Sequence, residues 1–424
     1  MEKPLTKNII PGSAPYDLEG YRRAGGYNGL RKALKSMTPV EITGLVKSSN
    51  LLGRGGAGFP TGVKWSLVPM DGDRSKPKYL VCNADEMEPG TFKDRYLLEG
   101  NPHQLIEGMI IAAYAIQAEK AYIFLRWAYK KAEILLRKAI DEAYSAGFLG
   151  KNIQGSGFNL DLYIHSSAGR YICGEETALL NSLEGKRAIP RTKPPYPAIS
   201  GLFGRPTVVN NVETLCWISH LVENGAEWFK ALSLTGTGGT KLFGISGRVN
   251  NPGSWELPLG VTMRELIEVH AGGMADGYKF RGALPGGAST DFLIEEHLDV
   301  KMDFTTVAAA GSRLGTGTMI ILDDRTCPVA FIHSVEKFFA LESCGWCTPC
   351  REGLPWVEKI LASIEDGTGK MEYLELLNFN AKFFGPGNTF CSHAPGAAEP
   401  LQSGLKYFHD DFIKHISDKK CPWR

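Results

Sequence analysis

The 424-residue chain lacks an excess of charge of either sign, because 47 Lys and Arg residues balance 46 Asp and Glu residues. A protein that mainly binds nucleic acid needs a strong basic excess to displace counterions, so the balance argues against this class. With 43% hydrophobic and 22% charged residues, the composition is that of a folded protein with a substantial core. Extended disorder is therefore excluded, and the length predicts about three domains.

Long hydrophobic runs are also missing. The longest apolar stretch, residues 109–116, is far shorter than the roughly 20 residues that cross a bilayer. The first residues, Met-Glu-Lys-Pro-Leu-Thr-Lys-Asn, lack the apolar run of a signal peptide. We therefore expect a soluble, cytoplasmic protein without direct membrane insertion, which can still sit on a membrane-bound partner.

Glycine and clustered cysteine are what the chain has in plenty. Glycine accounts for 49 residues, about 12% against a usual 7%. Five of the nine cysteines lie beyond residue 340. In a reducing compartment such a group favours a metal site over a disulfide framework.

Strand-like and helix-like segments alternate between about residues 78 and 225. Predicted strands are 78–82, 121–126 and 160–166, and predicted helices are 101–117, 129–146 and 175–183. This alternation predicts an α/β fold with parallel strands and crossover helices. A periodic stretch at 39–52 precedes it, and a glycine-rich run follows that stretch.

Two further units follow. After residue 236 a small β-rich unit is expected, with a strand at 241–246, a helix at 262–270 and strands near Thr305 and Met319. The segments 334–341, 351–364, 371–384 and 397–415 all have helical patterns. The expected division is an N-terminal segment 1–65, an α/β domain 66–235, the β-rich unit 236–333 and a helical bundle 334–424.

The thiols of Cys344, Cys347 and Cys350 follow one another at spacings of three, and Cys391 comes much later. Three close thiolates and a remote one suit the corners of a [4Fe–4S] cluster. A zinc site with the same four thiolates is the alternative, although zinc sites more often pair two short Cys-x-x-Cys turns. His393 competes as a fourth ligand. Cys421 is expected to be a bystander, and the remaining thiols are expected in or near the core: Cys82, Cys173, Cys216 and Cys327.

Residues 53–58 match the pattern G-x-G-x-x-G, but the residues before them look helical. Because the dinucleotide fingerprint requires a preceding strand, a standard Rossmann loop is not predicted. Successive glycines still let a phosphate or a flat ring approach the backbone amides, and Lys64 could supply a countercharge. A merely flexible loop is the alternative.

Polar clusters recur at strand-to-helix junctions of the predicted sheet. The segment 83–90 places Asp85, Glu86 and Glu88 after the first strand, at the edge where open α/β sheets bind ligands. Glu175-Glu176 and Asn210-Asn211 open later helices, whose free amides can hold anions. One shared cofactor pocket explains the three junctions better than three separate loops do.

These motifs resemble those of the NADH-binding flavoprotein subunit of respiratory complex I. The resemblance rests on residues 53–62, 82–95, 171–178, 210–214 and 342–353, in the family's order, and covers most of the chain. The diaphorase parts of NAD-dependent hydrogenases and formate dehydrogenases share the module. The resemblance implies a Rossmann-like FMN domain, a ubiquitin-like β-grasp domain and a cluster-bearing helical bundle.

The resemblance also implies FMN, a [4Fe–4S] cluster held by Cys344, Cys347, Cys350 and Cys391, and NADH as substrate. For FMN it suggests Gly55, Gly56, Gly58, Lys64, Asn83, Asp85, Glu86, Tyr171, Gly174, Glu175, Asn210, Asn211 and Thr214. For NADH it suggests Phe59, Glu88, Glu176, Lys193 and Tyr196, with Glu88 and Glu176 at the catalytic position.

The implied activity is hydride transfer from NADH to FMN, followed by single-electron transfer to the cluster and on towards quinone. The implied partners are a thioredoxin-like [2Fe–2S] subunit and a larger iron–sulfur subunit, in a peripheral arm on the cytoplasmic side of the inner membrane. Alternatives are a diaphorase subunit of a soluble hydrogenase or formate dehydrogenase, and a non-catalytic scaffold with structural zinc. Two departures from the family's pattern are Met87 and the pair Trp127-Ala128.

Overall fold

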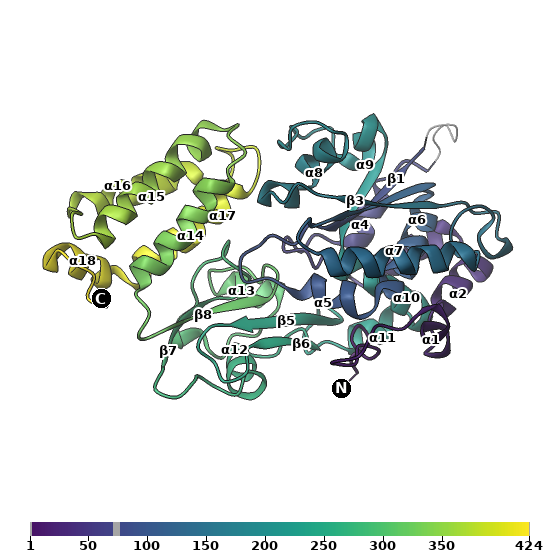
Figure 1. Cartoon of the computed structure of the whole chain (residues 1–424), viewed down its shortest axis with the longest axis horizontal. Helices are drawn as coiled ribbons and strands as arrows, with labels where there is room; N and C mark the ends of the chain where they lie inside the picture. Colours follow the sequence, from purple (N-terminus) through teal and green to yellow (C-terminus); the bar gives the residue numbers. More distant parts are fainter. Residues whose placement is uncertain (1, 71–76, 424) are drawn as a thin grey trace.

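The first sheet consists of β1 (Tyr79–Ala84), β2 (Lys120–Leu125), β3 (Asp161–Ser166) and β4 (Thr207–Asn211), in the order β3-β2-β1-β4. All neighbouring strands pair in parallel, as predicted, and Cys82 lies between Ile123 and Asn210. The computed structural model describes residues 2–70 and 77–423. Figure 1 shows this sheet and its helices on the right, a second sheet below the centre and a helical bundle on the left.

Both faces of the first sheet are covered. Leu80 and Cys82 face a core shared with α6 (Pro102–Ile116), α7 (Lys130–Ser145) and α10 (Val212–Asn224). Val81 faces a smaller core with α8 (Glu176–Leu183), against which Cys344 and Cys391 of the bundle pack. A strand buried on both faces explains the continuous apolar run at 79–82.

The glycine-rich loop follows a helix, as the sequence indicated. Helix α3 (Pro39–Ser48) begins with a capping box in which Thr38 and Glu41 exchange hydrogen bonds. Helix α4 (Thr61–Ser66) begins directly after the loop. Other helices of this part are α1 (Leu18–Arg23), α2 (Asn28–Ser36), α5 (Lys93–Gly100), α9 (Pro197–Ser200) and α11 (Ala226–Ala231).

The second sheet consists of β5 (Thr240–Ser246), β6 (Gly253–Pro258), β7 (Phe280–Leu284) and β8 (Thr318–Asp323), in the order β6-β5-β8-β7. Its central strands β5 and β8 are parallel and its outer strands are antiparallel to them, which is the arrangement expected of a β-grasp unit. The region predicted as one helix at 262–270 forms α12 (Met263–Glu265) and a π-helical turn, Leu266–His270.

The predicted strand near Thr305 is wrong. Residues Phe304–Ala309 form helix α13, because the carboxylate of Asp303 accepts hydrogen bonds from the backbone amides of Thr305 and Thr306. This N-cap overrides the strand preference of two adjacent β-branched residues.

The bundle consists of α14 (Pro328–Glu342), α15 (Leu354–Glu365), α16 (Glu372–Phe384), α17 (His393–Tyr407) and α18 (His409–Asp418). Helix α14 begins earlier than residue 334, with Cys327 as its N-cap and proline in its first turn. The segment 397–415 divides into two helices at Phe408 rather than forming one. Among residues 2–70 and 77–423, none of the helices is long and apolar enough to cross a bilayer.

Candidate functional site

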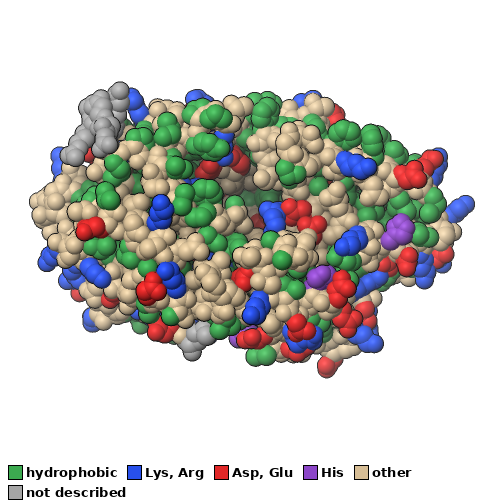
Figure 2. Space-filling model, turned by 180° about the vertical axis from the view of Figure 1, so that it is seen from behind, with side chains coloured by type: hydrophobic (Ala, Val, Ile, Leu, Met, Phe, Trp, Pro, Cys, Tyr) green, Lys and Arg blue, Asp and Glu red, His purple; other side chains and the backbone are tan. Residues whose placement is uncertain are grey.

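A cavity of about 780 Å³ lies at the carboxyl edge of the first sheet. The structure brings every predicted FMN and NADH residue to its wall: Gly55, Gly56, Gly58, Phe59, Lys64, Asn83, Asp85, Glu86, Glu88, Tyr171, Gly174, Glu175, Glu176, Lys193, Tyr196, Asn210, Asn211 and Thr214. Figure 2 shows a hollow near the middle of the opposite side of the molecule, with acidic and basic side chains at its rim. The cavity is large enough for a nucleotide-sized ligand.

The glycine loop forms one wall because it lies against the start of α10. The backbone amide of Arg54 donates to the hydroxyl of Thr214 over 2.8 Å, and a Cβ on Gly55 would lie 3.1 Å from that of Asn211. Gly56 has a φ of +128°, which side chains rarely adopt. The bare backbone therefore leaves room for a ligand beside the free amides of a helix start.

Asp85 has an unused acceptor at the cavity. Its Oδ1 accepts a hydrogen bond from the hydroxyl of Ser167 over 2.8 Å, whereas its Oδ2 is buried without a partner among the described residues. Burial raises the pKa of Asp85 to about 6. Because a buried polar atom without a partner is costly, Oδ2 fits a ligand that donates a hydrogen bond there.

Glu86 holds the site together more than it faces a ligand. Its carboxylate accepts hydrogen bonds from the backbone amides of Asp94 and Arg95, at the start of α5, and from the hydroxyl of Tyr129. Arg126 donates to the carbonyl of Glu86 over 2.6 Å. The departure at Trp127-Ala128 therefore leaves both anchors of this loop in place.

Glu88 joins the first domain to the β-grasp unit. The hydroxyl of Tyr171 donates to its Oε2 over 2.5 Å, and the backbone amide of Ser289 donates to its Oε1 over 2.7 Å. Burial raises the pKa of Glu88, and these two hydrogen bonds oppose the rise. Glu88 is thus a partly buried carboxylate held in one orientation at the cavity wall.

Glu175 and Glu176 have different tasks. The Oε2 of Glu175 accepts from the backbone amides of Thr177 and Ala178, so this residue is the N-cap of α8. Glu176 forms ion pairs of 2.9 Å with both Lys64 and Lys193. Burial alone would raise the pKa of Glu176, but these two cations hold this pKa below its usual range. Glu176 is therefore ionised at neutral pH.

The cavity also has residues that the sequence patterns did not single out. Lys93 is 1% exposed and pairs with Asp94 at 2.6 Å and with Glu213 at 2.9 Å. Arg313 comes from the β-grasp unit, and Ser392 comes from the bundle. Lys93 belongs to the motif 82–95 that carried the resemblance, so the motif itself was the available signal. Nothing local in the sequence places Arg313 at this wall.

The four predicted cluster thiols are neighbours. Burial, with a smaller effect of neighbouring thiols such as Cys344, raises the pKa of Cys350 to about 11 and that of Cys391 to about 12. The hydroxyl of Ser343 lies 3.1 Å from the sulfur of Cys350, and a backbone amide at residue 390 donates to Cys347. Cys391 also lines the cavity. Four thiols with hydrogen-bond donors around them suit an iron–sulfur cluster, whose sulfurs accept such bonds.

His393, the competing fourth ligand, has one ring nitrogen engaged. Its Nε2 donates a hydrogen bond to the carbonyl of Phe339 over 2.8 Å. Its Nδ1 is buried and has no hydrogen-bond partner among the described residues, so only this nitrogen is available to a metal ion.

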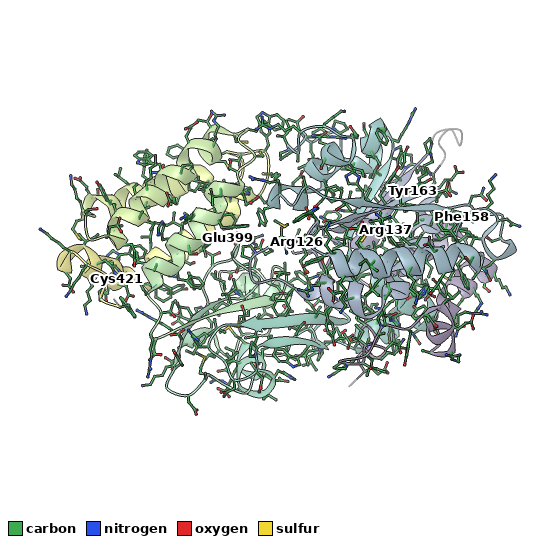
Figure 3. The ribbon with its side chains drawn as sticks, in the orientation of Figure 1. Arg126, Arg137, Phe158, Tyr163, Glu399 and Cys421 are labelled. Carbon is green, nitrogen blue, oxygen red and sulfur yellow. The ribbon has the colours of Figure 1, made fainter. Side chains whose placement is uncertain are left out.

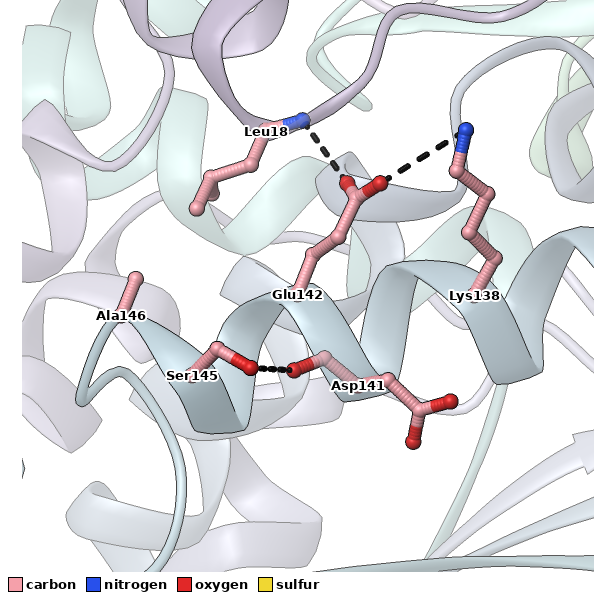
Figure 4. A pocket seen from close by; sticks show the side chains of 6 residues that line it. All are labelled: Leu18, Lys138, Asp141, Glu142, Ser145 and Ala146. Carbon is pink, nitrogen blue, oxygen red and sulfur yellow. Dashed lines mark hydrogen bonds and ion pairs between the residues drawn. The ribbon is translucent and has the colours of Figure 1, made fainter.

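A second, shallower hollow lies beside α7, and the carboxylate of Glu142 at its centre already has hydrogen-bond and ion-pair partners (Figure 4). This carboxylate, that of Glu142, accepts from the backbone amide of Leu18 over 2.9 Å and pairs with Lys138 at 3.7 Å. The hollow therefore serves to dock α1 on α7.

Comparisons with known proteins agree with this geometry. Residues 46–220 match the family of the Nuo51 FMN-binding domain, residues 242–293 match the SLBB domain, and residues 330–415 match the NADH-ubiquinone oxidoreductase-F iron-sulfur binding region. The fold and the site thus define a flavoprotein of the FMN and [4Fe–4S] class.

The relatives narrow this class. The F subunits of the NADH-quinone oxidoreductases of Salmonella typhimurium and Escherichia coli are each 56% identical over 96% of this chain and 92% of their own. A NAD⁺-reducing [NiFe]-hydrogenase has a TM-score of 0.82 at 34% identity, over 99% of this chain and 67% of that chain. The chain belongs to the family of NADH-quinone oxidoreductase F subunits. It is an oxidoreductase component that uses NADH, FMN and a [4Fe–4S] cluster, and its likeness to the hydrogenase reflects a shared module.

Proposed function

We propose that this chain receives a hydride from NADH in the cavity at the edge of the first sheet and passes electrons out through the four cluster thiols. The observation that carries the proposal concerns Cys391, which lines the same cavity as the glycine loop and Asp85 and packs, like Cys344, against the smaller core of the first sheet. FMN supplies the conversion between a two-electron hydride donor and a one-electron cluster. In this proposal, FMN lies in the cavity, and the cluster that receives its electrons lies next to the cavity wall that contains Cys391.

The cavity residues divide into those that we assign to FMN and those that we assign to NADH. The glycines 55, 56 and 58, with Asn210, Asn211 and Thr214, hold the phosphate end of FMN, while Asn83, Asp85, Tyr171 and Gly174 hold the remainder. Lys64, Glu86 and Glu175 support this pocket through their own hydrogen bonds and ion pairs. Phe59, Glu88, Glu176, Lys193 and Tyr196 bind NADH. Phe59 and Tyr196 are about half exposed, as residues that receive an exchanging substrate need to be.

Partner and location follow from the same proposal. The electrons leave to a thioredoxin-like [2Fe–2S] subunit and then to a larger iron–sulfur subunit of one complex, on the cytoplasmic side of a membrane. The α/β domain 66–235 binds FMN and NADH, with the glycine loop of segment 1–65. The β-grasp unit runs from 236 to the start of α14, and the remaining helices carry the cluster.

A glycine pair tests the pocket. A Val at position 55 would press on Asn211, whereas a Cβ at Gly236 meets nothing within 4 Å. We expect Gly55→Val to lower FMN affinity by at least tenfold and Gly236→Val to keep it, measured as flavin content and as bleaching by NADH in the visible spectrum. Equal flavin content in both variants, or a wild-type chain that NADH does not bleach, would contradict the proposal.

A further inference from the structure

Four potential metal ligands meet at the end of the bundle, away from the cavity. Cys327, Glu365, His415 and Cys421 are all buried, and one ligand atom from each lies within 4.8 Å of the others. Figure 3 labels Cys421 at the left end of the molecule. The sequence alone predicts an isolated core thiol at Cys327 and a bystander at Cys421, because the two lie far apart along the chain and only the fold unites them.

The distances among these atoms suit a tetrahedral ion. The Sγ of Cys327 lies 3.3 Å from Nε2 of His415 and 3.6 Å from Oε2 of Glu365, and those two atoms are 3.5 Å apart. Zinc bonds of about 2.0–2.3 Å at tetrahedral angles place neighbouring ligand atoms about 3.3–3.8 Å apart. Three of the four ligand atoms therefore already have the spacing of a zinc site, and the sulfur of Cys421 lies within 4.8 Å of each of them.

His415 is oriented as a metal ligand. Its Nδ1 lies 2.6 Å from the carbonyl of Asp411, one turn earlier in α18. Since a carbonyl accepts only, Nδ1 carries the proton and Nε2 presents its lone pair to Cys327 and Glu365. Hydrogen bonding of the second ring nitrogen to a carbonyl is the usual support of a zinc-bound histidine.

Cys327 is oriented in the same way. It is the N-cap of α14, and the backbone amide of Ala330 donates to its sulfur over 3.3 Å. Burial raises the pKa of the Cys327 thiol, and the Ala330 amide opposes that rise. The same amide and the positive end of the helix would stabilise negative charge on a sulfur that binds a metal ion.

The backbone brings Cys421 back to the cluster. Lys419, the C-cap of α18, has the left-handed conformation, with a φ of +52°. Gly367 follows α15 with a φ of +78°, and a Cβ there would overlap the carbonyl of Lys419. This close approach holds the C-terminal turn against the end of α15, where Glu365 lies. The ring of Trp423 then stacks on His415, with centroids 5.7 Å apart.

We propose that Cys327, Glu365, His415 and Cys421 bind one structural Zn²⁺, separate from the iron–sulfur cluster. Four protein ligands fill a tetrahedron and leave no open position, as structural zinc sites do. The ion ties the start of α14, the end of α15 and α18 together. It also neutralises buried thiolate and carboxylate charge that would otherwise be costly.

Metal analysis of the full chain, purified with its cluster, tests the proposal. We expect one zinc per chain besides the iron, lost at least tenfold in Cys421→Ser and retained in Cys216→Ser, which removes a buried thiol elsewhere. Cys347→Ala tests whether the zinc sits in the iron–sulfur site by mistake. This variant has lost a cluster thiol but keeps all four proposed zinc ligands, so it should retain its zinc. Cobalt in its place should give a thiolate-to-metal absorption that Cys421→Ser lacks.

His415→Gln replaces Cys421→Ser if the latter does not fold, with the same expected loss of zinc. Loss of zinc should also lower the melting temperature of the bundle, and added Zn²⁺ should restore it in the wild type only. Wild-type chain without zinc, equal zinc in the ligand variants, or a Cys327–Cys421 disulfide found by mass spectrometry would overturn the proposal.

Discussion

The hydroxyl of Tyr171, whose ring packs against the core of the helical bundle, donates a hydrogen bond of 2.5 Å to the carboxylate of Glu88 in the loop after β1. The hydrogen bond lowers the pKa of Glu88 against the rise that burial causes. Tyr171→Phe removes the donor, so the pKa of Glu88 should rise further. The acidic limb of kcat/KM for NADH should then move to higher pH.

A pH profile of NADH oxidation measures this shift. Tyr163→Phe is the matched control, because Tyr163 is exposed on β3 and does not line the cavity. Superimposable acidic limbs for Tyr171→Phe and wild type would show that Glu88 does not titrate in the reaction.

We expect the choice between NADH and NADPH to depend on Glu176. Its two lysine partners keep it ionised, and a carboxylate accepts from ribose hydroxyls but repels a 2′-phosphate. We expect Glu176→Gln to narrow the preference for NADH over NADPH by tenfold or more, about 1.4 kcal/mol. The ratio of kcat/KM for the two nucleotides measures this preference, with Glu227→Gln, at an exposed position of α11, as the control. An equal change for both nucleotides would count against the assignment.

Met87 and Trp127 both depart from the family's pattern, and substitutions at the two positions can be compared with each other. Met87 lines the cavity between Glu86 and Glu88, whereas Trp127 is 59% exposed and outside it. Met87→Ser should change the inhibition constant of NAD⁺ by about threefold, roughly 0.7 kcal/mol, and leave flavin content unchanged. Trp127→Ala should change neither. Inhibition by NAD⁺ at the wild-type constant in Met87→Ser would place the side chain outside the nucleotide site.

Glu213 is a buried carboxylate beside the cavity residue Lys93. Burial alone would raise the pKa of Glu213, but three buried cations hold this pKa at about 2: Lys241, Lys93 and Arg54. In the unfolded chain it titrates at about 4.3, so the stabilisation is complete above that pH and is lost as the pH falls from there towards 2.

Glu213→Gln should lower the free energy of unfolding by about 3–5 kcal/mol at pH 7, because it leaves buried lysine charge unpaired. Glu223→Gln, on the exposed end of the same helix, should cost little. Denaturant unfolding at pH 7 and near pH 3 measures both effects. A Glu213→Gln chain as stable as wild type at pH 7 would contradict the ionised state of Glu213.

Local patterns predicted the first three strands of the first sheet well because these strands alternate along the chain with helices of a distinct hydrophobic period. They did not predict β4, which is five residues long and runs directly into α10. They also failed at Thr305, where a cap overrides strand preference. The motifs located nearly the whole cavity wall, but Arg313 and the meeting of Cys327 with Cys421 depend on the packing of distant segments, to which local patterns are blind.

The electron route is tested by separating its two steps. Cys347→Ala removes one of the four thiolates and leaves the cubane with an open iron, so the cluster should be lost or degraded. The cavity wall comes from other segments, and Cys347 is not part of it. The variant should therefore bind FMN, be bleached by NADH and reduce a small artificial acceptor, while transfer to its iron–sulfur partner collapses.

Folding must be checked first, since metal binding is coupled to folding and the bundle could open without its cluster. Circular dichroism and flavin content provide that check, and Cys216→Ala serves as the control because its thiol lies in α10, away from the other four. A folded, flavin-loaded variant should still reduce the artificial acceptor but no longer reduce the iron–sulfur partner. This result would show that electrons pass through the cluster after they leave the flavin. Normal reduction of the partner by a variant without a cluster would instead show that electrons leave by a route other than Cys344, Cys347, Cys350 and Cys391.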